Sequence, residues 1–278
     1  MQKRVIAIND ISSFGKCSLT VAISILSASG IELCAVPTAV LSAHTGFKGY
    51  TFRDLTDNIL PSARHWKDME LSFDGIYTGY LGSKEQVECV LQVMDMFSVG
   101  MKLVDPVMGD DGVLYDGFTP DFPLEMKKLI KKADIIVPNV TESCLLTGIE
   151  YREEHSKEYI KGLIEKLKEI TDAKIIITGI NSKEDKISTA VYDNDEVLFV
   201  ENEKQQEVYS GTGDVFASTF MSAVMKGFNI KESAQIAADF VGECIEITNK
   251  NTAGRHYGIN FELNTQSLLD KLNGGKTK

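Results

Sequence analysis

The sequence predicts an α/β protein: a three-layer sandwich in which helices cover both faces of a mostly parallel central sheet. Two observations lead to this fold class. Short β-prone apolar runs alternate with apolar-periodic segments along most of the chain, and such alternation implies crossovers between parallel strands. Neither an internal repeat nor a linker rich in proline or serine interrupts the 278 residues. We therefore expect one domain over residues 1–278.

The expected elements follow in chain order. A strand at residues 4–9 precedes a helix at 19–28, a strand at 33–40, a helix at 52–66, a strand at 75–81 and a helix at 85–97. Strands at 102–107, 134–137 and 174–178 are separated by helices at 124–132 and 157–170. A hairpin of strands 186–193 and 196–203, joined at Asn194, leads to helices at 214–226, 230–248 and 265–272.

Charge and cysteine usage limit the classes of partner. The chain has 40 acidic and 29 basic residues, a net charge of -11, and no compensating basic block, which disfavours nucleic-acid binding. An anionic ligand must then be held by local devices such as backbone amides, helix N-termini or a metal ion. Five scattered cysteines without a CxxC pair are typical of a reducing compartment. With neither a signal peptide nor a membrane-spanning apolar run, we expect a cytoplasmic protein without membrane contact.

Polar, glycine-rich segments follow the predicted strands. Ligands of open parallel sheets bind beyond the carboxyl ends of the strands. The segments at that edge are 9–10, 42–46, 78–80, 105–109, 138–142 and 178–179. Any one of them could be an ordinary turn, but six at one edge favour a binding site.

The strongest local signal is SGTGDVFA at 210–217, between the hairpin and a helix of small and apolar residues. Gly211 and Gly213 let the backbone approach a ligand, and the helix N-terminus adds free amides and a positive dipole end. Asp214, in the first helical turn, could accept a proton from an alcohol that attacks a phosphoryl group. The alternative is that Asp214 only caps the helix.

Two familiar phosphate motifs fail. FGKCS at 14–18 resembles the end of a P-loop, but its hydroxyl is displaced by one position and Asp10 stands where the first glycine is required. The glycine pair at 211 and 213 lacks the third glycine of a dinucleotide site and lies late in the chain.

A metal site and an aromatic pocket are predicted at the same edge. Asp105, directly before a proline, and Glu142 could hold Mg²⁺, which needs only one or two carboxylates together with substrate phosphates. The alternatives are a turn carboxylate for Asp105 and a helix start for Glu142. His44 and Tyr80 are candidate walls for a flat substrate, although either could be a structural residue.

Together these segments resemble the ribokinase superfamily, and within it the vitamin kinases, particularly pyridoxal or pyridoxamine kinases. GTGD alone is typical of the whole superfamily, whereas TGYLGS with DPVMGD indicates the vitamin kinases. The matching segments are SAHTG (42–46), TGYLGS (78–83), DPVMGD (105–110), DIIVPN (134–139) with Glu142, IT (177–178) and GTGD (211–214).

The resemblance implies a ribokinase-like fold and ATP-dependent phosphorylation of a hydroxymethyl group on a pyridine or pyrimidine ring. It implies that Asp214 is the base and that the amides of Gly211, Thr212 and Gly213 stabilise the transferred phosphoryl group. It further implies roles for the following residues: Asp105 and Glu142 with Mg²⁺; Asn139, Glu142, Thr178, Gly179 and Gly213 with ATP; Asp10, Ser12, His44, Thr45 and Tyr80 with the vitamin. K⁺ is a candidate second ion, and a homodimer is expected by analogy.

The chain departs from the family pattern in two places. Many pyridoxal kinases have a substrate-contacting serine where this chain has Asp10, and Ser12 follows two residues later. An acidic group there favours a cationic vitamer, so we expect a preference for pyridoxamine over pyridoxal. Some relatives have a cysteine in the lid after DPVMG; residues 110–119 contain none, so we expect a lid that covers the site without covalent capture.

Three alternatives to a vitamin B6 kinase stay open. A hydroxymethylpyrimidine kinase of thiamine synthesis shares most of the motifs. A carbohydrate or nucleoside kinase is disfavoured by TGYLGS and DPVMGD. A non-catalytic relative that binds pyridoxal phosphate is disfavoured by Asp214 and the intact glycine pair, because a pure binder has no need of a base.

Overall fold

The computed structural model describes residues 2–183, 186–203, 209–251 and 257–274. The strands of its main sheet are β1 (Arg4–Ser12), β2 (Glu32–Leu41), β3 (Phe52–Asp54), β4 (Gly75–Thr78), β5 (Met101–Val104), β8 (Ile135–Ile136), β9 (Lys174–Lys183), β10 (Lys186–Asp193) and β11 (Glu196–Glu203). A separate small ribbon pairs β6 (Gly109–Asp110) with β7 (Val113–Leu114). The helices are α1 (Ser18–Ala28), α2 (Thr56–Asp68), α3 (Lys84–Met96), α4 (Phe122–Ile130), α5 (Val140–Thr147), α6 (Lys157–Lys168), α7 (Thr212–Met225), α8 (Ile230–Asn251) and α9 (Thr265–Leu272), with a 3-10 turn η1 (Phe261–Asn264).

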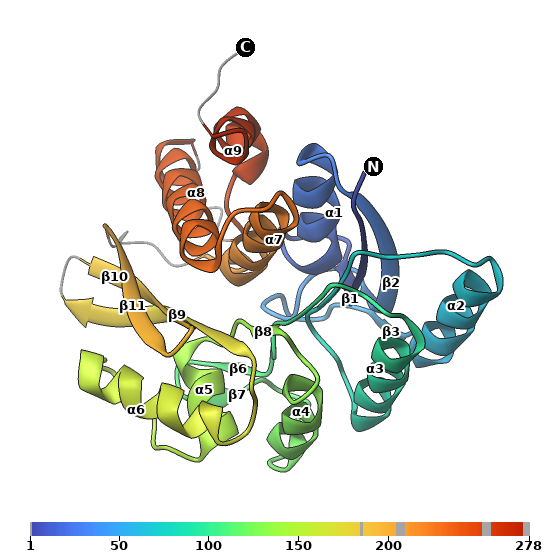
Figure 1. The fold of residues 1–278 in the computed structure, drawn as a ribbon, viewed down its shortest axis with the longest axis horizontal. Helices are drawn as coiled ribbons and strands as arrows, with labels where there is room; N and C mark the ends of the chain where they lie inside the picture. The colour runs from blue at the N-terminus through green and yellow to red at the C-terminus, as the bar shows by residue number, and fades with distance from the viewer. Residues whose placement is uncertain (1, 184–185, 204–208, 252–256, 275–278) are drawn as a thin grey trace.

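The main sheet runs in the order β11-β10-β9-β8-β5-β4-β1-β2-β3. Its central strands, from β9 to β2, are all parallel, whereas β3 at one edge and β10 and β11 at the other pair antiparallel. In Figure 1, α1, α7, α8 and α9 lie on one side of the sheet and α2 to α6 lie on the other. The predicted fold class, three layers around a mostly parallel sheet, is therefore confirmed.

Strand β1 shows why the central strands are continuously apolar. Ile6 and Ile8 belong to the core under α2 to α6, whereas Val5 and Ala7 face the opposite core with α1, α7 and α8. All four side chains are fully buried, because helices cover both faces of the sheet and leave no polar side. No helix in the described ranges combines the length and apolarity needed to cross a bilayer.

The predicted helix at 52–66 is wrong at its start. Residues Phe52–Asp54 form the edge strand β3, which pairs antiparallel with the end of β2. The helix α2 begins only at Thr56, whose amide is bound by Asp54 Oδ1 at 2.8 Å. All three residues of β3 are exposed. The segment therefore lacks the alternation of buried apolar and exposed polar residues by which a strand is predicted from sequence.

Several predicted strand ends also shift. The strands predicted at 75–81, 102–107 and 134–137 end at Thr78, Val104 and Ile136, and Pro106 cannot donate to the ladder that a strand to 107 would need. In contrast, β1 continues to Ser12 through an irregularity between Asn9 and Ile11. The strand β9 continues to Lys183 because it pairs with β10. The shortened β5 leaves Asp105 just beyond its end, whereas Asn9, Asp10 and Thr178 lie within the lengthened strands β1 and β9.

Candidate active site

The glycine segment before α7 forms a cradle of backbone amides. Gly211 precedes the helix in a left-handed conformation, φ 78°, and makes no side-chain cap. The first amides of α7 have no partners within the helix and point to one place, together with the positive end of the helix dipole. Asp214 lies inside the helix and makes no capping hydrogen bond to it, so the alternative of a simple helix cap is wrong.

The Asp214 carboxylate is held from the central sheet. Asn9, within β1 just before its irregularity, donates a hydrogen bond from Nδ2 to Asp214 Oδ1 at 3.4 Å. Burial, with a smaller contribution from the charge of Asp10, raises the pKa of Asp214 to about 6 against the opposing effect of hydrogen bonds from the Ser18 amide and Asn9. A carboxyl group with this pKa is ionised at neutral pH and remains basic enough to accept a proton.

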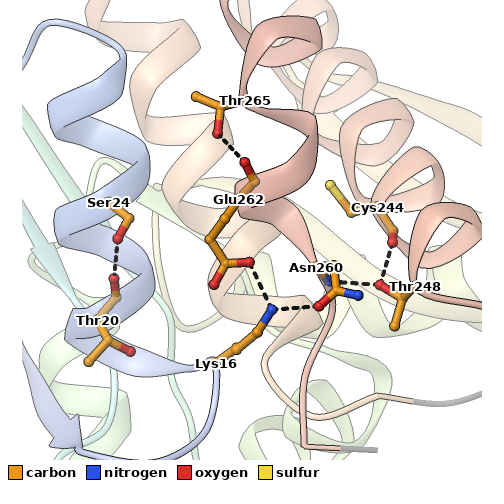
Figure 2. A network of polar contacts seen from close by, with 8 residues as sticks. All are labelled: Lys16, Thr20, Ser24, Cys244, Thr248, Asn260, Glu262 and Thr265. Carbon is orange, nitrogen blue, oxygen red and sulfur yellow. Dashed lines mark hydrogen bonds and ion pairs between the residues drawn. The ribbon is translucent and has the colours of Figure 1, made fainter. Parts of the chain in front are cut away.

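Lys16 contacts the cradle through its backbone, and sequence reasoning missed this residue. Figure 2 shows the contacts that its side chain makes. Its carbonyl oxygen lies directly beneath Gly211, where a Cβ atom would come within 1.9 Å of it. Its ammonium Nζ donates to Asn260 Oδ1 at 2.7 Å and to Glu262 Oε2 at 2.8 Å. Asn260 is in turn fixed to α8, because its amide donates to Thr248 Oγ1 at 2.7 Å. The lysine amine therefore binds Asn260 and the adjoining η1 segment.

The predicted pocket residues gather around Asp10. Ser12 donates from Oγ to Asp10 Oδ2 at 2.9 Å, and both side chains are buried. Burial raises the pKa of Asp10, and hydrogen bonds from Ser18 and Ser12 oppose this. Burial, and then the nearby Asp10 charge, raise the pKa of Tyr80 to about 12. The structure thus places Tyr80, Ser12 and Asp10 together.

His44 presents a hydrogen-bond donor on the same side of the site. Its Nδ1 accepts from the Gly46 amide at 3.1 Å, so the neutral ring carries its proton on Nε2. Burial lowers the pKa of His44, which favours this neutral form, although the Asp10 charge acts in the opposite sense. Among the described residues Nε2 has no partner and is buried. Thr45 is exposed in the adjoining turn.

Asp105 and Glu142 form a buried acidic pair. Burial and then the charge of Glu142 raise the pKa of Asp105 well above its usual range, and burial raises the pKa of Glu142. Glu142 Oε2 and Oε1 accept from the amides of Asn139 (2.8 Å) and Met108 (3.2 Å), whereas no described residue donates a hydrogen bond to Asp105. Glu142 therefore lies in the first turn of α5, which agrees with the alternative of a helix start. Its charge nevertheless acts on Asp105.

This pair suits a hard divalent cation. Both carboxylates are buried, and no described residue donates a hydrogen bond to Asp105. The pair therefore has oxygen ligands and negative charge available for a cation. In the described part of the chain, no cluster of three or more His, Cys, Asp or Glu side chains could hold a metal ion.

Asn139, which precedes α5, and Thr178, within β9, lie side by side. An isolated parallel bridge joins them. Asn139 Oδ1 accepts from the Glu142 amide at 2.7 Å and its Nδ2 donates to the Gly109 carbonyl at 2.9 Å, so its side chain also organises the loop. Gly179 follows in a left-handed conformation, φ 70°, and is exposed.

Tyr115 is a second residue that sequence reasoning missed. It follows the β6–β7 ribbon inside the predicted lid, and its amide donates to the Met108 carbonyl at 3.0 Å. Burial raises its pKa, as do the charges of Glu142, Asp110 and Asp105, so the phenol stands near the acidic pair. A lone aromatic residue in the polar segment DDGVLYDG was the only available signal.

An amide cradle at a helix N-terminus and a carboxylate in the same turn, at the carboxyl edge of a parallel sheet, define a phosphotransferase that acts on a hydroxyl group. Comparison with known proteins agrees with this class. The family model for phosphomethylpyrimidine kinase matches residues 24–260. The chain belongs to this family of vitamin kinases.

The proteins with similar sequences include kinases named for two different substrates. A pyridoxal kinase of Ovis aries is 29% identical over 220 residues, which cover 69% of this chain and 68% of that protein. A hydroxymethylpyrimidine/phosphomethylpyrimidine kinase of Bacillus subtilis is 28% identical over 204 residues, covering 72% and 73%.

Solved structures agree closely in fold. A protein of Bacteroides thetaiotaomicron provisionally assigned as a phosphomethylpyrimidine kinase, crystallised with pyridoxal, has a TM-score of 0.92 at 35% identity and 96% coverage of both chains. The pyridoxal kinase of Lactobacillus plantarum has a TM-score of 0.90 at 28% identity over the full length of both chains.

Proposed function

We propose that this protein transfers the terminal phosphoryl group of ATP to the 5'-hydroxymethyl group of vitamin B6. The observation that carries the proposal is the position of Asp214, which lies beside the amide cradle of α7 and is linked by Asn9 to the residues around Asp10. The base and the amides therefore lie next to residues that we expect to contact the vitamin. A relative 35% identical to this chain was crystallised with pyridoxal, which supports the choice of substrate.

In this mechanism Asp214 accepts the proton of the attacking hydroxyl group. The amides of Gly211, Thr212 and Gly213 donate to the oxygens of the transferred phosphoryl group, where negative charge is concentrated. The cradle is set before substrate binds, because Gly211 is fixed against the Lys16 carbonyl. Phosphoryl transfer depends mainly on such positioning and charge stabilisation.

Asp105 and Glu142 would hold Mg²⁺, and Asn139, Thr178 and Gly179 would face the nucleotide phosphates. Bound there, Mg²⁺ would neutralise charge on the phosphates. The two carboxyls repel each other in the metal-free protein, so their own contribution is a site that favours a cation. The resemblance also suggests K⁺ as a second ion and a homodimer, which sedimentation would test. A cytoplasmic location remains the expectation from the scattered cysteines.

The vitamin ring would lie between His44 and Tyr80. His44 offers the N–H of Nε2, and Asp10 offers a buried carboxylate that accepts from Ser12. A buried acceptor of this kind favours a cationic group on the substrate, so the preference for pyridoxamine stays our prediction.

A coupled assay for ADP release tests the proposal. Pyridoxal, pyridoxamine, pyridoxine and hydroxymethylpyrimidine are compared side by side, with Asp214→Asn as the isosteric variant. We expect turnover of the three B6 vitamers and a loss of on the order of a hundredfold or more in the variant. No turnover of any of the four would refute a vitamin kinase of this substrate class.

The second candidate is a hydroxymethylpyrimidine kinase. The family model and the Bacillus subtilis relative favour it, because both rings present a hydroxymethyl group to the same machinery. A kcat/KM for hydroxymethylpyrimidine at least tenfold above those of all three B6 vitamers would select this candidate.

A further inference from the structure

Asn9 connects the base to the substrate pocket through one buried side chain. It is 1% exposed and lies within β1, at the irregularity in its pairing with β2. Its Oδ1 accepts from the amides of Tyr80 at 2.8 Å and Asp10 at 2.9 Å. Its Nδ2 donates to Asp214 Oδ1 at 3.4 Å. One side chain thus contacts both predicted pocket segments and the predicted base.

The surroundings fix which way this amide points. Both partners of Oδ1 are backbone N–H groups, which can only donate, so the oxygen must face them. The NH₂ group must then face Asp214, and a flipped amide would set donors against donors. Gly79 closes the remaining side: a Cβ atom there would lie 2.2 Å from Asn9 Nδ2 and 2.5 Å from Cγ. Asn9 therefore has no room to turn away.

On the basis of the proposed function, we propose that Asn9 is a positioning residue that holds the Asp214 carboxylate in its ionised form and aims it at the attacking hydroxyl group. The Ser18 amide is the second donor to this carboxylate. A carboxylate has about four acceptor positions, so two N–H donors fix its orientation and leave capacity for the substrate proton.

The remaining ionisable groups around Asp214 make a donor necessary. Asp10 on β1 and Asp105 after β5 carry like charge. Tyr77 on β4, Tyr115 beyond β7 and Cys17 before α1 also interact with the Asp214 charge. Lys16, whose carbonyl lies beside Gly211, directs its amine to Glu262 instead. Hydrogen bonds from Asn9 and the Ser18 amide are therefore what stabilises the ionised carboxylate.

The substitution Asn9→Asp tests this role with little change in shape. It keeps an oxygen for the Tyr80 and Asp10 amides, but it removes the NH₂ donor and adds a carboxyl group, so a variant without the added charge is compared with it. The readout is the carboxyl ¹³C titration of Asp214 in aspartate-labelled protein, with the signal assigned by its loss in Asp214→Asn. We expect the titration midpoint to rise by about one pH unit or more, the acid limb of kcat/KM to move with it, and kcat to fall at least about tenfold at pH 6. KM should change less than about twofold.

Two further variants complete the test. Gly79→Ala displaces the Asn9 amide without adding an acid, so its midpoint should rise in the same direction even if Asn9→Asp does not fold. The matched control is Asn229→Asp, the same chemical change at an exposed residue whose Oδ1 binds the Glu232 amide at 2.9 Å; it should leave the midpoint unchanged.

The outcomes separate the inference from the proposed function. An Asp214 midpoint that stays within about 0.2 pH units in both Asn9→Asp and Gly79→Ala overturns the role of Asn9. If the wild-type protein phosphorylates none of the four vitamin substrates, the proposed function fails, and the titration still decides whether Asn9 controls the carboxylate.

Discussion

Gly211→Ala is the substitution that most directly probes the amide cradle, because it adds one methyl group and removes no donor. Two costs can be read from the structure. The φ of 78° is unfavourable for any residue with a Cβ atom, by about 1–2 kcal/mol. In addition, the new Cβ would lie 1.9 Å from the Lys16 carbonyl oxygen. Reaching an acceptable 3.0 Å requires a backbone displacement of about 1 Å at the N-terminus of α7.

The two costs predict different effects. The conformational cost lowers the melting temperature by about 2–4 °C, since 1 kcal/mol corresponds to roughly 2 °C in a chain of this size. The displacement moves the amides relative to Asp214, and a misplacement of about 1 Å at a reacting centre can cost on the order of a hundredfold in rate. We therefore expect kcat/KM for the preferred vitamer to fall by about a hundredfold.

Two glycines provide matched controls. Gly30 has a similar φ of 82° but open space around its Cβ position, so Gly30→Ala should lower the melting temperature by about 2–4 °C without loss of activity. Gly213 has neither a positive φ nor a neighbour within 4 Å, so Gly213→Ala should leave the melting temperature unchanged; a loss of activity there would report a Cβ atom beside the phosphoryl group and not a displaced helix. Full activity in Gly211→Ala, in coupled assays beside these controls, would refute the argument that the Lys16 carbonyl fixes the cradle.

Three further predictions follow from the site. Because burial raises the pKa of Asp214 to about 6, kcat/KM should fall about tenfold per pH unit well below pH 6; a pH-rate profile that stays flat to pH 5 would contradict this. Asp105→Asn should raise the melting temperature of the metal-free protein, because it removes repulsion from Glu142. In thermal-shift measurements the same substitution should abolish most of the stabilisation by Mg²⁺; unchanged Mg²⁺ stabilisation would exclude Asp105 as a ligand. Lys16→Met removes the contacts to Asn260 and Glu262. It should lower the melting temperature by about 2 °C and should also lower kcat/KM. The control Lys128→Met, at an exposed helical ion pair, should leave kcat/KM unchanged.

The fold class and the order of most elements could be predicted because they depend on local periodicity. A buried parallel strand such as β1 is apolar at every position, and the helices between strands show an apolar face. The short edge strand β3 could not be predicted, since its three residues are exposed and its pairing with β2 depends on contacts outside the segment. The same limit applies to the strand ends, which the neighbouring strands determine.

For the site, the sequence provided the residues that form recognisable local patterns. The glycine pair before Asp214 and the acidic residues after the strands could be found because each lies in a short segment of distinctive composition. Asn9 and Lys16 could not be assigned roles in this way. Their decisive partners, Asp214 and Asn260, are 205 and 244 residues away along the chain, so no local pattern connects them.

The acidic character of the site follows from the chemistry proposed for it. Asp10, Asp105, Glu142 and Asp214 all have a pKa raised mainly by burial, so each destabilises the free protein when it is ionised at neutral pH. Each would gain a counterpart from a ligand: a cation on the vitamin, Mg²⁺, or the substrate hydroxyl proton. Binding of these groups would relieve the destabilisation of the free site, and this relief would increase their affinity. An amide cradle can still receive phosphate within this negative field, because its donors are uncharged and fixed in place.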